Sequence, residues 1–314
     1  MKYTKDFSWK QGMNVNDFLS QLGDVGFQSV ELKAASDLII KMKQSGAKIY
    51  MTFTSNMVTS GLRGLFAQLI KLGMIDIIVT TAGAIEEDFM KALGEKFELG
   101  SFYADDVSLH ERGENRVGNL VIRNESYMKF EDKLTPLIQI IYDKQKRLPV
   151  SEFLEELGNA IDDKSSILYQ AAKNKIPIFC PGITDGAIGF HLFMFQQSHK
   201  DFVIDVVQDF KNIIFCSNHD EKKGIIALGG SISKHHAILS GLLNGGFEYA
   251  LYMTTAHQSS GSMSGATTQE AKSWGKIKDD ADAVTVIGDV SINFPLAICR
   301  SLDILNERGV LKNE

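Results

Sequence analysis

Three side chains with complementary chemistry lie within seven residues of one another in the last quarter of the chain. Glu270, Trp274 and Lys276 end the stretch LYMTTAHQSSGSMSGATTQEAKSWGK, which begins at Leu251. A carboxylate, an indole and an amine can supply a partner for a cation, a flat apolar wall and a nucleophile. The serines, threonines and glycines before them let the backbone wrap around a ligand. This stretch is therefore the first candidate site, against the alternative that Lys276 is an ordinary surface charge.

Lys276 can act as a nucleophile only if its amine loses a proton, because a free lysine has a pKa of about 10.4. Burial beside Trp274 and near a positively charged cofactor ring would lower that pKa. His235 and His236 follow a Gly229-Gly230 turn, and one of them could act as a general base or a hydrogen-bond donor. Adjacent helical residues face different directions, so at most one points into a site. No His-x-x-x-His spacing occurs there, so no metal site is predicted.

Six short runs rich in β-branched residues each end in a polar or glycine-rich cluster, and a helix follows most of them. This alternation predicts an α/β fold with a doubly wound, largely parallel, Rossmann-like sheet and helices on both faces. The six predicted strands are Lys48–Thr54, Asp76–Thr81, Ile176–Cys180, Gly224–Leu228, Phe247–Thr254 and Ala283–Ile287.

Helical periodicity fills much of the remaining chain. The predicted helices lie around residues 18–22, 30–42, 135–142, 150–160 and 202–210, and from Phe294 onward. Residues 96–135 lack strong periodicity, and we expect them to form an inserted irregular segment. No linker or low-complexity stretch interrupts the sequence, so a single domain over residues 1–314 is predicted.

Ligands of doubly wound sheets bind beyond the carboxyl ends of the strands. The six clusters should therefore converge on one site. No complete Gly-x-Gly-x-x-Gly fingerprint is present, but the turns Thr81-Ala82-Gly83 and Gly229-Gly230 both end strands, and together they favour a dinucleotide. Glu87, Asp185 and Asp289 could hold ribose hydroxyls. The alternatives are a helix N-terminal charge for Glu87 and an N-cap for Asp185.

The composition is that of a soluble globular protein, with 44% hydrophobic and 23% charged residues among 314. A net charge of −6 argues against a general nucleic-acid binder. The polar N-terminus does not resemble a signal peptide, and no apolar run is long enough to span a membrane. Cys180, Cys216 and Cys299 show neither disulfide nor metal spacing, so a reduced, cytoplasmic location is predicted.

The clusters together resemble the deoxyhypusine synthase family over nearly the whole chain. The matching motifs occur in the family's order: TSNMVTSG from Thr54, DIIVTTAGAIEED from Asp76, the segment 115–132, ITDGAIG from Ile183, LGGSISKHH from Leu228 and SWGKI from Ser273. The resemblance implies an NAD-dependent transferase of hypusine biosynthesis that is typically a homotetramer. Such an enzyme moves an aminobutyl group from spermidine, through an imine on a lysine, to a lysine of a translation factor.

The resemblance also assigns roles to residues of this sequence. It implies that Lys276 forms the imine and that His235 contacts the reacting amine. The implied substrate contacts are Glu270, Trp274, Gly261 and Ser262. The implied NAD contacts are Ser55, Asn56, Met57, Val58, Thr59, Thr81, Ala82, Gly83, Glu87, Asp185, Gly230, Thr255, Ala256 and Asp289. No metal is implied.

The chain departs from the family at the expected polyamine pocket. The family usually has aspartates where this chain has Phe190 and Met263, and a third acidic position is Ser260 here. A buried ammonium without its carboxylate is strongly destabilised. Two alternatives therefore stay open: a homospermidine synthase-like transferase acting on another small amine, and an NAD-binding regulatory protein without turnover. The presence of both Lys276 and His235 weighs against the second.

Overall fold

The computed structural model describes residues 3–311, which form two compact units. The first unit consists of the chain up to Phe53, the segment Leu72–Val79 and the chain from Ile213 onward. The second consists of Thr54–Lys71 and Thr80–Asn212. Each unit thus combines segments that are distant in the sequence. A single domain over residues 1–314 stays a prediction.

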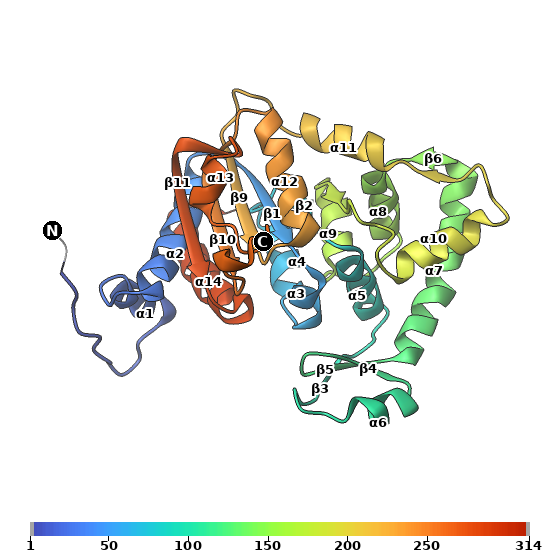
Figure 1. The fold of residues 1–314 in the computed structure, drawn as a ribbon, viewed down its shortest axis with the longest axis horizontal. Coiled ribbons are helices and arrows are strands. Elements are labelled where there is room, and N and C mark those ends of the chain that lie inside the picture. Colours follow the sequence, from blue (N-terminus) through green and yellow to red (C-terminus); the bar gives the residue numbers. More distant parts are fainter. Residues whose placement is uncertain (1–2, 312–314) are drawn as a thin grey trace. The chain divides into compact units, whose positions relative to one another are not determined.

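The first unit is built on a parallel sheet (Figure 1). Its strands run in the order β11-β10-β9-β1-β2, and each neighbouring pair is parallel. Their bounds are β1 Lys48–Phe53, β2 Ile77–Val79, β9 Lys223–Leu228, β10 Phe247–Thr254 and β11 Ile277–Ile287. Every residue of β9 is buried, as is every residue of β1 except Lys48. Strands covered on both faces have continuous apolar sequences, which is why periodicity located them.

Helices cover both faces of this sheet. Tyr249 and Tyr252 are three residues apart on β10, so their side chains point to opposite faces. Lys41 of α2 lies over the Tyr249 ring at 5.9 Å, and Lys234 of α12 lies over the Tyr252 ring at 4.0 Å. The helices of the unit are α1 Val15–Leu22, α2 Gln28–Gln44, α12 Ser231–Leu243, α13 Thr268–Lys272 and α14 Val290–Glu307, with a 3₁₀ turn η1 at Gln258–Ser260. The predicted doubly wound α/β class is confirmed.

The second unit is mainly helical. Its helices are α3 Ser55–Thr59, α4 Arg63–Lys71, α5 Ala82–Ala92, α7 Asn124–Lys144, α8 Val150–Asn159, α9 Ile167–Asn174, α10 Ala187–Gln196 and most of α11 Val206–Phe215. It also contains β7 Ile178–Phe179 and the parallel pair β6 Arg147–Leu148 and β8 Val203–Ile204. Each of the six predicted strands therefore overlaps a strand of the structure. The helix predicted over 202–210 begins later, because 203–204 pairs with β6.

The predicted irregular insertion is more regular than its sequence suggested. It holds an antiparallel sheet in the order β3-β5-β4, with α6 Asp106–Glu111 before β4. The strands are β3 Glu98–Leu99, β4 Glu114–Val117 and β5 Leu120–Arg123, and α7 begins directly after β5. A two-residue Gly118-Asn119 turn joins β4 to β5. The strands are short and half exposed, so they lack the apolar runs that revealed the large sheet.

Within residues 3–311, no helix has both the length and the apolar character required to cross a membrane.

Candidate functional site

The first unit brings three of the predicted clusters together. Strands β9, β10 and β11 are adjacent and parallel, so the loops after their carboxyl ends lie at one edge of the sheet. The Gly229 amide donates to the Met253 carbonyl at 2.7 Å, and the Gly288 amide donates to the Thr254 carbonyl at 2.9 Å. These bonds join the starts of the loops after β9 and β11 to the end of β10. The three loops therefore lie at one edge of the sheet, and their convergence on one ligand site stays a prediction.

Gly230 lies where the loop after β10 meets the start of α12. A Cβ atom there would lie 2.3 Å from Ser264 Oγ and 2.4 Å from Ser264 Cα. The next residue, Ser231, has a φ of 60°, and its amide donates to Ser264 Oγ at 3.0 Å. A side chain at position 230 would displace Ser264, which accepts the hydrogen bond from the Ser231 amide. Only glycine therefore fits at this position.

Replacing Gly230 by alanine should lower the free energy of unfolding by about 1–3 kcal/mol, the usual cost of overpacking. It should also displace the loop that carries Ser264. Urea denaturation measures the first effect. Gly64→Ala in α4 is the control, because a Cβ atom there meets nothing within 4 Å, and that variant should be as stable as the parent or more so. Equal stability of the two variants would contradict the close packing at Gly230.

Lys276 and His235 lie close together in the first unit. Lys276 joins α13 to β11, is only 8% exposed, and has its Nζ atom 4.9 Å from the Trp274 ring. Burial lowers the pKa of Lys276. Burial also lowers the pKa of His235, and the positive charge of Lys276 lowers it further. The pair therefore favours a neutral imidazole beside an amine that releases its proton more readily than a surface lysine.

The predicted substrate contacts Glu270, Trp274, Gly261 and Ser262 belong to the same connection between β10 and β11. Trp274 is half-buried, and Glu270 is exposed in the first turn of α13. Gly261 adopts a left-handed φ of 65°, and Ser262 Oγ lies 3.0 Å from Ser260 Oγ. Their contacts with a substrate stay predictions.

Lys234 is a buried residue beside the predicted site that sequence reasoning missed. Its side chain is fully buried, and Nζ donates to the carbonyls of Met263 at 3.0 Å and Ala266 at 2.8 Å. Burial lowers its pKa to about 8, although the charge of Glu270 opposes the shift. Lys234 thus connects α12 by hydrogen bonds to the serine-glycine loop, the segment 257–266 after β10. The available signal was its place on the same apolar helix face as Ala237 and Ile238.

Three predicted cofactor contacts of this unit lie in the loops after β10 and β11. Thr255 and Ala256 follow β10, and the Ala256 amide donates to Thr254 Oγ1 at 3.0 Å. Asp289 caps α14, because its carboxylate accepts from the Ser291 amide at 2.7 Å and from Ser291 Oγ at 2.6 Å. A cap is therefore an established structural role of Asp289, and its contact with NAD stays a prediction.

The second unit holds the remaining predicted cofactor contacts, most of them on α3 and α5. These helices pack closely at Gly83 and Ser55. A Cβ atom added to Gly83 would lie only 3.0 Å from Ser55 Cβ. Thr81 precedes α5, and its Oγ1 is buried without a hydrogen-bond partner among the described residues. Buried hydroxyls are rarely left unsatisfied. Thr81 therefore fits a site that a hydroxyl-rich or phosphate-bearing group such as NAD completes.

Glu87 is not a helix N-terminal charge. Because α5 begins at Ala82, Glu87 lies in its second turn, and it is 7% exposed. Burial raises its pKa to about 7, against the opposing hydrogen bond from Thr59. Thr59 Oγ1 lies 2.5 Å from Glu87 Oε2 and 3.0 Å from the Ser55 carbonyl. One hydroxyl proton can serve only one of these acceptors, so protonation of Glu87 satisfies both contacts.

The raised pKa of Glu87 predicts a specific pH dependence of stability. The folded state holds this proton more tightly than the unfolded state, so the contribution is complete below about pH 4.5 and is lost as the pH rises to about 7. Its size is at most about 3 kcal/mol. Thermal unfolding between pH 4 and 8 should show that Glu87→Gln loses less stability over this range than the parent protein. Glu111→Gln, at an exposed position, should follow the parent; parallel curves for all three would refute the assignment.

Asp185 does not cap α10, so that alternative is wrong. The N-cap residue is Gly186, and the carboxylate of Glu86 accepts from the Ile188 amide at 2.8 Å. A Cβ atom on Gly186 would lie 2.3 Å from Glu86 Oε1, which explains the glycine. Asp185 is exposed, and its contact with NAD stays a prediction. Phe190, on the same helix, is 57% exposed.

The part of the chain that the structure describes contains no group of three or more His, Cys, Asp or Glu side chains suited to a metal ion. Cys180, Cys216 and Cys299 form no disulfide with one another in the described part of the chain.

A family model, curated relatives and a solved structure all match this chain and carry the same family description. The family model for deoxyhypusine synthase matches residues 17–300. The deoxyhypusine synthase of Candida glabrata is 37% identical, covering 91% of this chain and 86% of its own length. That of Senecio vernalis is 34% identical, covering 97% and 90%. A crystal structure assigned as deoxyhypusine synthase from Entamoeba histolytica superposes with a TM-score of 0.68 at 26% identity, covering 96% of this chain and 97% of that one.

These matches include every motif on which the resemblance rested, and they extend over both units of the structure. The agreement covers the sequence, through relatives above 30% identity, and the fold, through the superposed structure. The names of the relatives favour the aminobutyl-transferase interpretation over the homospermidine synthase-like and regulatory alternatives. The chain therefore belongs to the deoxyhypusine synthase family of enzymes.

Proposed function

We propose that this protein transfers an aminobutyl group from spermidine to a lysine of a translation factor, with NAD as cofactor and Lys276 as the covalent carrier. The observation that carries the proposal is the environment of Lys276. Lys276 is buried, and its amine lies beside the Trp274 ring. The amine is also near enough to His235 for its charge to lower the pKa of that imidazole. A nucleophilic lysine needs such desolvation, whereas a surface lysine does not.

NAD, when bound, would accept a hydride from the substrate's secondary amine and return it at the end of the reaction. Lys276 contributes its neutral amine, which adds to the carbon of the oxidised amine. The bond to diaminopropane then breaks, and the aminobutyl group remains as an imine on Lys276. His235, neutral because its pKa is lowered, can take up and return the protons of this exchange. The acceptor lysine then replaces Lys276 at the imine carbon.

The residues that would hold NAD are those predicted from the resemblance. In the second unit, Thr81 offers an unsatisfied buried hydroxyl, and Ser55 packs against Gly83. In the first unit, Gly230 allows the close approach of the serine-glycine loop. A protonated Glu87 could donate to an acceptor, and its ionised form could accept from a ribose hydroxyl. The homotetramer and the cytoplasmic location stay predictions.

The test is chemical trapping of the carrier. The purified protein is incubated with NAD and spermidine, reduced with borohydride and analysed by mass spectrometry. We expect diaminopropane to be released and a butylamine adduct to form on Lys276. NAD binding without diaminopropane release would contradict spermidine as the donor. An adduct on another lysine would contradict the role of Lys276.

A further inference from the structure

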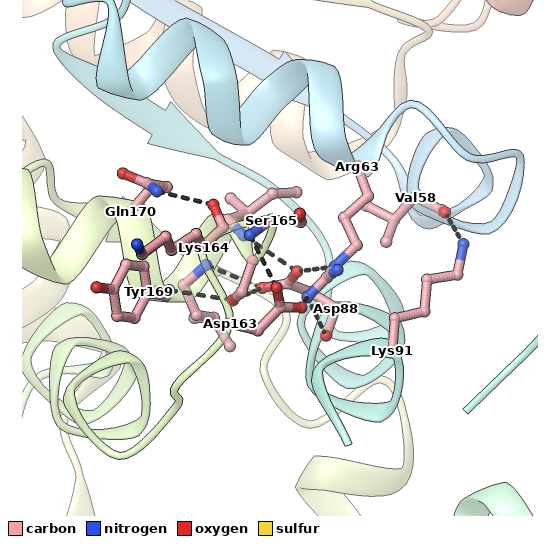
Figure 2. A network of polar contacts seen from close by, with 12 residues as sticks. Val58, Arg63, Asp88, Lys91, Asp163, Lys164, Ser165, Tyr169 and Gln170 are labelled. Carbon is pink, nitrogen blue, oxygen red and sulfur yellow. Dashed lines mark hydrogen bonds and ion pairs between the residues drawn. The ribbon is translucent and has the colours of Figure 1, made fainter. Parts of the chain in front are cut away.

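A lysine outside all the predicted site residues contacts the end of α3. Helix α3 has five residues, which is too short to be stable by itself. Lys91 of α5 donates from Nζ to the Val58 carbonyl at 2.6 Å and to the Thr59 carbonyl at 3.2 Å. Figure 2 shows this side chain extending from α5 to Val58. A cation at the carbonyl end of a helix is favourable. The Val58 carbonyl also accepts from the Gly61 amide at 3.3 Å, so Lys91 adds a charged donor to a carbonyl that already has a backbone one.

The amine of Lys91 lies in an unfavourable environment for a cation. The residue is half-buried, its Nζ atom lies 4.5 Å from the Phe97 ring, and burial lowers its pKa despite the nearby charge of Glu87. Desolvating an ammonium group is costly unless hydrogen bonds compensate. The compensation here comes from the backbone of α3.

Glu87 and Lys91 form a two-point attachment of α3 to α5. They are four residues apart, so they lie on one face of α5. Glu87 contacts the Thr59 hydroxyl at 2.5 Å, and Lys91 binds the Val58 and Thr59 carbonyls. Both contacts hold the end of α3 that is remote from Ser55, while Gly83 allows the beginning of α3 to pack against α5.

We propose that Lys91 is a positioning residue for the cofactor: it fixes α3 so that the residues Ser55–Thr59 are arranged for NAD before NAD binds. This inference rests on the proposed function, which assigns these residues to NAD. Lys91 does not itself touch the cofactor or the reacting atoms. Its removal therefore affects the binding of NAD rather than the chemistry at Lys276.

The experiment compares Lys91→Met, Lys91→Arg and Lys43→Met. Methionine retains an unbranched apolar stem without the charge, and arginine retains donors. Lys43 is the matched control, because its Nζ also donates to a backbone carbonyl, that of Gly73 in the first unit. Isothermal titration with NAD gives the dissociation constant, circular dichroism tests folding, and hydrogen exchange of amides 55–61 without NAD reports the order of α3.

For Lys91→Met we expect about a tenfold or larger rise in the dissociation constant of NAD, the loss associated with charged hydrogen bonds. Exchange at amides 55–61 should be faster, and KM for NAD should rise while kcat at saturating NAD stays within about twofold. Lys91→Arg should recover most of the affinity, and Lys43→Met should bind NAD as the parent does.

An unchanged dissociation constant in Lys91→Met, or an equal loss in Lys43→Met, would overturn the inference. If Lys91→Met does not fold, Lys91→Leu, which also removes every donor, replaces it, and unchanged NAD affinity in that variant overturns the inference. Failure of the parent protein to bind NAD would refute the proposed function instead. The two failures are therefore distinguishable.

Discussion

Replacing Lys276 by arginine is expected to abolish aminobutyl transfer, with a loss of more than about a thousandfold in kcat, while NAD still binds. Arginine keeps the positive charge and much of the side-chain volume. Its guanidinium stays protonated at any accessible pH, so it cannot add to carbon. Release of diaminopropane, the borohydride-trapped adduct and NAD affinity are measured on the same preparation.

Lys272→Arg is the control for this substitution. Lys272 lies four residues earlier, on α13, and its Nζ donates to the Asp279 carbonyl at 2.7 Å. A covalent role is not expected for it, so its replacement should leave the adduct on Lys276 intact. Transfer that survives in Lys276→Arg would refute the carrier role. Loss of NAD binding in Lys276→Arg would mean that the substitution disturbs the fold of the site.

Replacing Asp88 by asparagine is expected to lower the free energy of unfolding by about 3–5 kcal/mol, the cost of breaking a buried ion pair. Asp88 and Arg63 are 1% and 9% exposed in their side chains, and Arg63 Nε lies 2.5 Å from Asp88 Oδ1. The Asp88 carboxylate also accepts from Ser166 Oγ and from the amides of Ile167 and Leu168. Together with Arg63, these groups give the Asp88 carboxylate four hydrogen-bond donors. In asparagine, an NH₂ group replaces one carboxylate oxygen, so a donor would point at other donors.

Urea denaturation measures this loss, and Asp163→Asn is the matched control. Asp163 accepts from the same guanidinium at 2.7 Å but is 27% exposed (Figure 2). Water can replace part of its contact, so we expect a loss of about 1 kcal/mol or less. Similar losses in the two variants would contradict the view that Asp88 is the buried centre of the network that joins α4, α5 and α9.

The sequence determined the fold class because strands covered on both faces must be apolar throughout. The runs that became β1, β9 and β10 are such strands, and their order with helices between them requires a parallel sheet. The insertion between α5 and α7 was missed as an antiparallel sheet, because its half-exposed strands carry only two to four residues each. Local periodicity is weak at that length.

The sequence also determined which residues are candidates for chemistry. Lys276, Trp274 and Glu270 are close in the chain, and the topological rule placed the loop after β9 beside them. Their roles follow from the family and stay predictions, as do those of Ser55–Thr59 and Thr81–Gly83. The spacing of residues along the chain and the order of motifs can be read from the sequence without a structure.

Only the tertiary structure decided how these segments are held. Lys234 and Lys91 are ordinary lysines in the sequence, and each binds two backbone carbonyls of a loop or short helix remote in the chain. The raised pKa of Glu87 and the capping contact of Glu86 likewise depend on burial and on partners 28 and 102 residues away. A side chain's desolvation and its hydrogen-bond partners are set by what packs around it, and residue type alone does not contain that information.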